Sequence, residues 1–282
     1  MKKIVLSLIL SVASNITYSG RVGVSTDTNW NGFYLGGNAG YWSSQANKIV
    51  TTGSVNYINP IFPLGAGNIA NALVLVATNN FSLDSTGFLA GGQAGYNYQQ
   101  SKKILLGLNV GFDGLVDSDR TYALQKVVNL TNFDEYYVGS LAVQQKIHYL
   151  GTVSARLGYL YHPNFLIYGT GGLAYGKIGL DTAWSVNESL GPTVFPPIAM
   201  QNNLSQTLPG WTAGAGVEWL FKPWSVKIDY TYYRLNTLNV PAVLAQRNAA
   251  ETPAILWGST DANTALTASI GSVRVGINYH FA

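Results

Sequence analysis

The stretch SVRVGINYHFA, residues 272–282, closes the chain and alternates between two kinds of side chain. One set is apolar and ends in two aromatic residues: Val273, Val275, Ile277, Tyr279 and Phe281. The other set is small, polar or charged: Ser272, Arg274, Gly276, Asn278 and His280. A period of two predicts a β-strand with two different faces. This closing strand therefore has one face suited to an apolar environment and one suited to a polar environment.

The same alternation recurs along the chain and predicts seven more strands. These segments lie at residues 33–42, 88–98, 104–113, 147–161, 165–176, 211–221 and 224–233. Each is about 10 to 15 residues long, and about 9 to 11 tilted residues cross a bilayer as a strand. In residues 147–161 the pattern places Ile147, Tyr149 and Leu157 on the apolar face, opposite His148 and Arg156.

The composition favours a membrane protein that crosses the bilayer without helices. Charged residues make up only 10% of the 282 residues, and aromatic residues make up 12%. No apolar run reaches the roughly 18 residues that a helix needs to span a bilayer, so a closed barrel is the remaining way to cross one. Cysteine is absent, and the net charge of +3 has no basic block, so we expect no disulfide framework and no nucleic acid partner.

The first residues predict export. A short positive region, residues 1–3, precedes an apolar stretch over residues 4–13 and then small residues, which is typical of a signal peptide. We therefore expect a signal peptide at residues 1–19, a periplasmic N-terminal segment at residues 20–29 and an outer-membrane barrel domain at residues 30–282.

The connections between the predicted strands alternate between short and long. Short connections are residues 99–103, 162–164 and 222–223. Long connections are residues 45–86, 114–146, 177–209 and 235–270. Short periplasmic turns and long extracellular loops are typical of outer-membrane barrels. The sequence predicts an all-β fold, a single antiparallel transmembrane barrel of eight strands. Another strand pair in the first long connection would make ten.

The inward faces of the predicted strands carry a few charged residues. They are Arg156, Glu218, Lys227, Asp229 and Arg274, with His148 and His280 on the same faces. Glu218 and Lys227 are symmetric about the turn at residues 222–223, so a simple hairpin puts them opposite each other. Charges in a lumen must pair or stay hydrated. They form either a network that fills the lumen or the selectivity element of a pore.

An enzyme, a metal site and a cofactor site find little support in the sequence. His148 starts a strand at the outer end, with Asp134 and Ser140 nearby, but their spacing is not diagnostic of a hydrolase. We expect no metal ligand set, no cofactor and no enzymatic activity. The long connections are apolar for exposed segments, as in PAVLAQRNAAETPAILWG (residues 241–258). They either bind partners, extend the barrel as hairpins or pack on one another.

Several motifs resemble a known family. WNGFYLGGNAGYW, GFLAGGQAGYNYQ, GWTAGAGVEW, WSVKIDYTYYRL and VRVGINYHF are similar to strands of the eight-stranded outer-membrane β-barrel proteins of Gram-negative bacteria, the opacity-type surface antigens and their porin-like relatives. The resemblance covers residues 30–281 and leaves the long connections unmatched. It implies that Tyr279 and Phe281 form an assembly signal for the barrel-assembly machinery, although Ala282 follows the aromatic endpoint here.

The sequence therefore predicts a surface protein of the bacterial outer membrane, surrounded by membrane lipid. Its expected role is structural or adhesive through four extracellular loops, which would contact host or envelope proteins. The alternatives are a narrow porin-like diffusion channel and a lipid-modifying outer-membrane enzyme. A secreted ligand-binding barrel would instead have an apolar interior and a polar exterior.

Overall fold

A computed structural model describes residues 29–58, 71–72, 74–116, 119–128, 135–190, 193–194, 198–240, 245–248 and 256–281. Over these ranges thirteen β-strands form one antiparallel sheet. No helix in the described ranges is long and apolar enough to cross a membrane. The predicted signal peptide, and all but the last residue of the segment at 20–29, lie outside the described residues.

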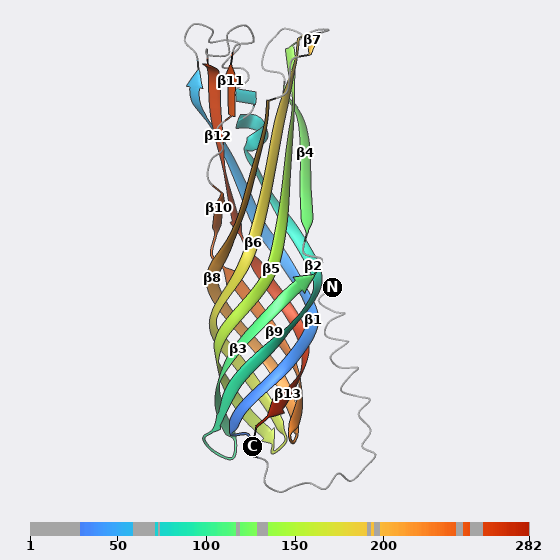
Figure 1. Cartoon of the computed structure of the whole chain (residues 1–282), viewed down its shortest axis with the longest axis vertical. Coiled ribbons are helices and arrows are strands. Elements are labelled where there is room, and N and C mark those ends of the chain that lie inside the picture. Colours follow the sequence, from blue (N-terminus) through green and yellow to red (C-terminus); the bar gives the residue numbers. More distant parts are fainter. Residues whose placement is uncertain are drawn as a thin grey trace.

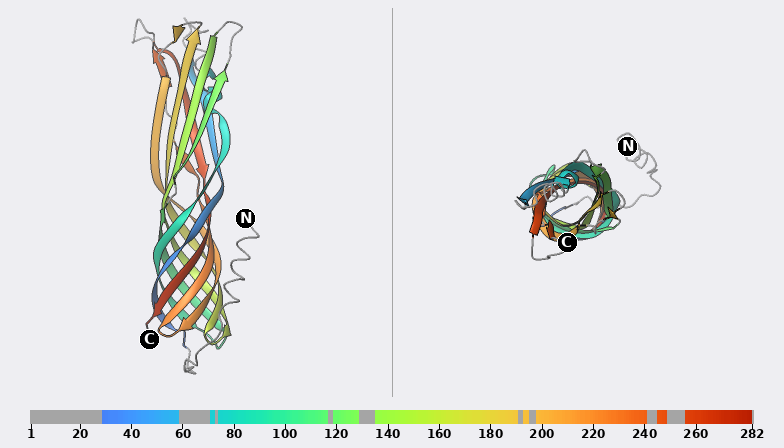
Figure 2. Two further views of the ribbon diagram at one scale, coloured as in Figure 1. Left: turned by 90° about the vertical axis from the view of Figure 1, so that its right-hand side faces the viewer. Right: turned by 90° about the horizontal axis from the view of Figure 1, so that it is seen from above.

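Eight of the strands close into a ring, because β1 pairs with both β13 and β2 (Figures 1 and 2). Around the ring they are β1 (Gly32–Ile58), β2 (Asn79–Gln99), β3 (Ile104–Val116), β5 (Glu135–His162), β6 (Phe165–Leu190), β8 (Ile198–Phe221), β9 (Trp224–Leu235) and β13 (Ser269–His280). The predicted eight-stranded antiparallel barrel is confirmed.

The remaining strands lie beyond one end of the ring. They are β4 (Arg120–Val128), β7 (Thr193–Val194), β10 (Leu238–Val240), β11 (Ala245–Asn248) and β12 (Leu256–Thr267). β4 pairs with β5, β7 with β6, β12 with β1, and both β10 and β11 pair with β12. Figure 1 shows this extension above the crossed strands of the ring.

Much of the long connections is strand rather than loop, which corrects their predicted extent. The β5–β6 ladder runs from His162 and Phe165 at the short turn to Glu135 and Leu190 at the far end. The first long connection continues β1 and β2 instead of adding a strand pair, so the ring keeps eight strands. Of the three arrangements expected for the long connections, hairpins that extend the barrel describe the structure best.

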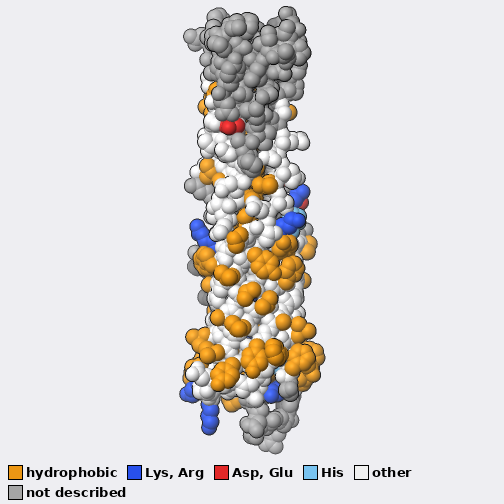
Figure 3. All heavy atoms as spheres, turned by 60° about the vertical axis from the view of Figure 1, so that its left-hand side comes forward, with side chains coloured by type: hydrophobic (Ala, Val, Ile, Leu, Met, Phe, Trp, Pro, Cys, Tyr) orange, Lys and Arg blue, Asp and Glu red, His pale blue; other side chains and the backbone are white. Residues whose placement is uncertain are grey.

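The lower part of the barrel has an apolar exterior and a polar interior. Phe33 and Leu157 are more than half exposed, whereas Asn278 and Glu218 are almost fully buried. Figure 3 shows these apolar side chains as a band across the face in view. Aromatic side chains mark both edges of this band, as Tyr41, Phe88, Phe112, Tyr175 and Trp211 at the outer edge and Phe33, Tyr98, Tyr161, Phe221, Trp224, Tyr279 and Phe281 at the short-turn edge. Such girdles are typical of a barrel surrounded by lipid.

The extension has the opposite arrangement, because water replaces lipid outside it. Its interior is a continuous apolar cluster that includes Ile49, Leu141, Val143, Ile178 and Leu180. Residues 74–77 are helical, and Val76 of this turn is buried in the same cluster. Burial of this apolar surface stabilises the part of the protein that stands outside the membrane.

A β-bulge at His148 separates the two arrangements within β5. The register passes from Ile147 opposite Ile178 to Tyr149 opposite Lys177, which leaves His148 without a partner in the ladder. One extra residue exchanges the two faces of a strand. Ile147 is therefore fully buried inside and His148 is exposed, so the predictions that Ile147 faces lipid and His148 faces inward are wrong.

Candidate functional site

The candidate site is the cluster of buried charged side chains inside the ring. Register places Glu218 of β8 directly opposite Lys227 of β9, as the spacing about the turn predicts. Asp229 of β9 lies opposite Arg274 of β13. Inward positions alternate along each strand, so both pairs point into the lumen.

One half of the cluster surrounds Glu218. Its carboxylate forms an ion pair with Arg156 and accepts hydrogen bonds from the Ser225 hydroxyl and, at 2.7 Å, from the Asn278 amide. The Arg156 guanidinium also lies 3.7 Å from the centre of the Tyr168 ring, a cation–π distance. The most buried carboxylate of the lumen is thus held by several donors at once.

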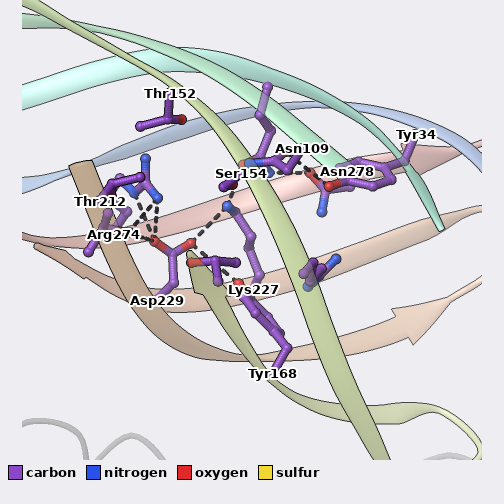
Figure 4. A pocket seen from close by; sticks show the side chains of 14 residues that line it. Tyr34, Asn109, Thr152, Ser154, Tyr168, Thr212, Lys227, Asp229, Arg274 and Asn278 are labelled. Atoms are coloured by element: carbon purple, nitrogen blue, oxygen red, sulfur yellow. Dashed lines mark hydrogen bonds and ion pairs between the residues drawn. The ribbon is translucent and has the colours of Figure 1, made fainter. Parts of the chain in front are cut away.

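The other half surrounds Asp229. Figure 4 shows Lys227 and Arg274 reaching its carboxylate, at 2.7 Å in both ion pairs. Arg274 also forms an ion pair with Asp113 of β3 at 2.9 Å and donates to the Thr231 hydroxyl at 2.8 Å. This arginine therefore bridges two strands on opposite sides of the lumen.

A pair of amides joins the two halves. Lys227 donates to the Gln93 carbonyl oxygen, and the Gln93 amide donates to Asn278, which contacts Glu218. The connected network contains three cations, Arg156, Lys227 and Arg274, and three carboxylates, Asp113, Glu218 and Asp229. Opposite charges balance, which lowers the cost of removing them from water.

The network leaves little free space. The cavity among these side chains has a volume of about 20 Å³, which is room for about one water molecule. Side chains therefore fill the lumen at this level, as eight-stranded barrels allow.

Apolar layers lie on both sides of the network. Towards the short turns, Trp30 packs with Leu105, Leu160, Leu166 and Leu220 in a buried cluster, which we call the Trp30 layer. The Trp30 indole donates to the Pro163 carbonyl oxygen of a short turn at 2.8 Å. Towards the extension lies the larger apolar cluster around Leu141 and Ile178. Ions moving along the axis would meet an apolar, a charged and a second apolar layer.

Ser225, His280 and Glu218 lie together, but not as a catalytic triad. The same His280 nitrogen, Nε2, lies 2.9 Å from the Ser225 hydroxyl and 3.5 Å from the Glu218 carboxylate. A triad needs the carboxylate on the other ring nitrogen. Ser225 is also fully buried. In the part of the chain that the structure describes, no group of three or more His, Asp or Glu residues is placed to hold a metal ion.

Comparison with known proteins identifies the family. The profile of the outer membrane protein β-barrel domain matches residues 5–281. The chain belongs to this family of outer-membrane β-barrel proteins. The 31 kDa outer-membrane immunogenic proteins of Brucella melitensis and Brucella suis are each 31% identical to it over 205 residues, which is 71% of this chain and 70% of each relative. The protein is thus located in the outer membrane.

Solved outer-membrane barrels are also similar. OprG from Pseudomonas aeruginosa has 9% identity and a TM-score of 0.38, covering 90% of this chain and 99% of that one. Neisserial surface protein A has 10% identity and a TM-score of 0.33, covering 88% of this chain and 97% of that one.

All five charged residues selected from the sequence, Arg156, Glu218, Lys227, Asp229 and Arg274, lie in the buried network. Tyr279 and Phe281 lie at the short-turn edge of the apolar band, with ring centres 5.1 Å apart. Their role as an assembly signal stays a prediction.

Ser140 and His148, two of the residues considered for catalysis, do not come together, because they lie far apart along β5. Ser140 exchanges a hydrogen bond with Ser185 at 2.7 Å, and His148 is exposed at the bulge. Asp134 lies outside the described residues.

Asp113 and Trp30 are among the site residues that the sequence analysis missed. Asp113 falls on the polar face of its strand, so the alternation along that strand could have assigned it to the network. Trp30 precedes the first strand, and no periodic signal indicates that its side chain enters the barrel.

Proposed function

We propose that this outer-membrane protein is a non-enzymatic, non-conducting surface protein whose role is structural or adhesive. The observation that carries the proposal is the filled lumen, where the charged network leaves only about 20 Å³ of free volume. The Trp30 layer and the apolar cluster of the extension support it, since bare ions cross apolar constrictions poorly.

Adhesion would reside in the extension, the part that stands beyond the apolar band. Its strands enclose a packed apolar interior, so it presents a stable surface outside the membrane. The Brucella relatives are named as immunogenic proteins, which supports surface exposure of this chain too. Its partners would be host or envelope proteins at the extension and membrane lipid around the band. The barrel-assembly machinery would recognise the strand ending at Tyr279 and Phe281.

A narrow diffusion channel is the second candidate. It is favoured by the charged lining of the lumen, since rings of charge select ions in pores. Opening such a channel would require the Arg156–Glu218 and Arg274–Asp113 pairs to separate.

Osmotic swelling of proteoliposomes separates the two candidates. Liposomes containing the refolded protein are diluted into small sugars, and the rate of swelling is compared with that of empty liposomes and of liposomes containing a general porin. We expect the protein to match the empty liposomes. Swelling that falls steeply as the sugar becomes larger would establish the channel and refute the proposal.

A further inference from the structure

Three lysines stand at the short-turn end of the barrel. Lys102 and Lys103 lie in the turn between β2 and β3, and Lys222 lies in the turn between β8 and β9. All three are exposed, and Figure 3 shows lysine or arginine side chains that protrude below the apolar band at this end. We call these three residues the lysine arc. The short turns of outer-membrane barrels lie on the periplasmic side, so the lysine arc faces the periplasm.

The turns at this end follow one another around the rim, because β2, β3, β5, β6, β8 and β9 are successive neighbours in the ring. The Lys103 carbonyl oxygen accepts a hydrogen bond from the Leu160 N–H of β5 at 2.9 Å. In the next turn, the Asn164 carbonyl oxygen accepts one from the Leu220 N–H of β8, also at 2.9 Å. These bonds tie each turn to the neighbouring strand, so the lysines are held along one continuous stretch of the rim.

The lysine arc has no countercharge at its own end of the barrel. None of its three ammonium groups has an ion-pair partner among the described residues. The described carboxylates outside the lumen lie at the outer edge of the apolar band or in the extension, as Asp84, Asp119, Asp181 and Asp261 do. There, Lys146 lies 3.5 Å from the carboxylate of Asp181. The described part of the periplasmic rim is therefore positive, whereas both signs of charge occur at the other end.

Exposed aromatic rings lie next to the lysine arc. The Lys103 ammonium group lies 6.0 Å from the centre of the Tyr159 ring, which is exposed on the outer face of β5. Tyr161 of the same strand is 76% exposed, and Phe221, the residue before Lys222, is exposed too. Aromatic belts mark the depth of lipid headgroups, and lysines beside them keep their ammonium groups at the polar side of the boundary. The lysine arc therefore lies at the depth of the headgroups of the periplasmic leaflet.

We propose that the lysine arc binds the headgroups of anionic phospholipids in the periplasmic leaflet. Each lysine near an anionic lipid surface adds a favourable electrostatic interaction, and here no carboxylate at the rim competes for it. An anionic lipid fits better than a zwitterionic one, because a zwitterionic headgroup brings a cation of its own to the lysines. A lipid fits better than a soluble anion, because exposed Tyr159 and Tyr161 suit the boundary between headgroups and acyl chains. The proposal rests on the place of the barrel in the outer membrane and holds for a closed or an open lumen.

Calorimetric titration of the full chain, refolded in a zwitterionic detergent, tests the proposal. The probes are dihexanoyl phosphatidylglycerol, dihexanoyl phosphatidylcholine and glycerol 3-phosphate, which carries the phosphate without acyl chains. The arc variant combines Lys102→Gln, Lys103→Gln and Lys222→Gln. The matched control combines Lys126→Gln, Lys146→Gln and Lys177→Gln, which removes the same charge at or beyond the outer edge of the apolar band. The heat-dependent gel shift of each variant verifies folding, and heats of injection into detergent alone are subtracted.

We expect phosphatidylglycerol to bind more tightly than phosphatidylcholine or glycerol 3-phosphate. The arc variant should weaken the binding of phosphatidylglycerol about tenfold or more, because it removes three cations close to the headgroups. The control variant should change this affinity less than about twofold, because its lysines lie at the other end of the barrel.

Three results would overturn the proposal. Equal affinity for phosphatidylglycerol and phosphatidylcholine would show that charge does not select the lipid. An equal loss in the control variant would place the binding elsewhere on the barrel. Equal affinity for glycerol 3-phosphate would show a free-anion site and overturn the lipid assignment. If the arc variant does not fold, binding of phosphatidylglycerol to the unaltered protein that about 0.5 M sodium chloride leaves unchanged overturns the proposal by itself, because salt screens exposed charges.

Discussion

Glu218 and Lys227 lie directly opposite each other across the β8–β9 hairpin, yet each has its shortest ion pair with another residue. Glu218 pairs with Arg156 of β5, and Lys227 pairs with Asp229 two positions along its own strand. The residue opposite in the hairpin is thus not the ion-pair partner. The charges are held by pairs between β5 and β8, within β9 and, through Arg274, between β13 and β3. Stability of the barrel should depend on these pairs more than on the hairpin pair.

Removal of Arg156 should leave Glu218 with no lysine or arginine at ion-pair distance among the described residues. We expect Arg156→Met to lower the free energy of unfolding by about 3 to 5 kcal/mol, because an unpaired buried charge is costly. Urea unfolding in lipid vesicles measures this. The double variant Arg156→Met with Glu218→Gln should recover part of the loss, and a loss that simply adds would argue against direct coupling.

The two aspartates that bind Arg274 should differ in importance. Asp229 pairs with both Lys227 and Arg274, whereas Asp113 pairs with Arg274 alone. We expect Asp229→Asn to cost about 3 to 5 kcal/mol and Asp113→Asn about 1 to 3 kcal/mol. Parallel urea titrations of the two isosteric variants give the order, and the reverse order would contradict the assigned contacts.

Trp30 should stabilise the short-turn end of the barrel. Trp30→Ala removes the largest side chain of the Trp30 layer and should cost about 3 to 5 kcal/mol, whereas Trp30→Phe keeps most of the packing and should cost less. Fluorescence-monitored unfolding compares the two. Equal, small losses would mean that Trp30 does not pack inside the barrel in solution.

The apolar band should tolerate charge poorly. Leu157→Arg places a charge on the lipid-facing side of β5 and should cost about 2 to 4 kcal/mol if it lies near the bilayer centre. Gln144→Arg, on the outward face of the same strand in the extension, should cost about 0.5 kcal/mol or less. Folding yields and stabilities in vesicles report both, and equal costs would place the band elsewhere.

Phe281 should matter for assembly more than for stability. It is half exposed at the rim, as is Phe221 at the end of β8. If the terminal aromatic residue is the assembly signal, Phe281→Ala should lower the amount of folded protein in the outer membrane several-fold, and Phe221→Ala should not. Heat-dependent gel mobility of membrane fractions measures folded protein, and equal effects would remove the special role of the last strand.

The strand alternation was visible in the sequence because a period of two is local. The stripe from Val273 to Phe281 faces outward as expected. The faces of Ile147 and His148 were not predictable, because one bulged residue exchanges the faces and nothing in the local pattern marks it. The predicted strands are shorter than the observed ones, because above the membrane the apolar side chains face the interior of the barrel instead of the lipid.

The sequence indicated which residues belong to the site better than it indicated which of them pair with each other. The alternation of side chains along each strand identified Arg156, Glu218 and Arg274 as inward-facing residues. Which charges meet depends on the stagger of strands around the closed ring, as in the contact of Arg274 with Asp113, 161 residues earlier in the chain. Trp30 lies outside any strand, so its position depends entirely on tertiary packing.

Single-channel recording in planar bilayers tests the closed lumen most directly. The refolded protein is inserted and recorded beside Glu218→Gln and Lys227→Met, with insertion verified by protease protection in the same lipid. We predict insertion without steady openings for the unaltered protein. Steady openings whose conductance changes in those two variants would show a charged, open pathway through the barrel and would contradict the account.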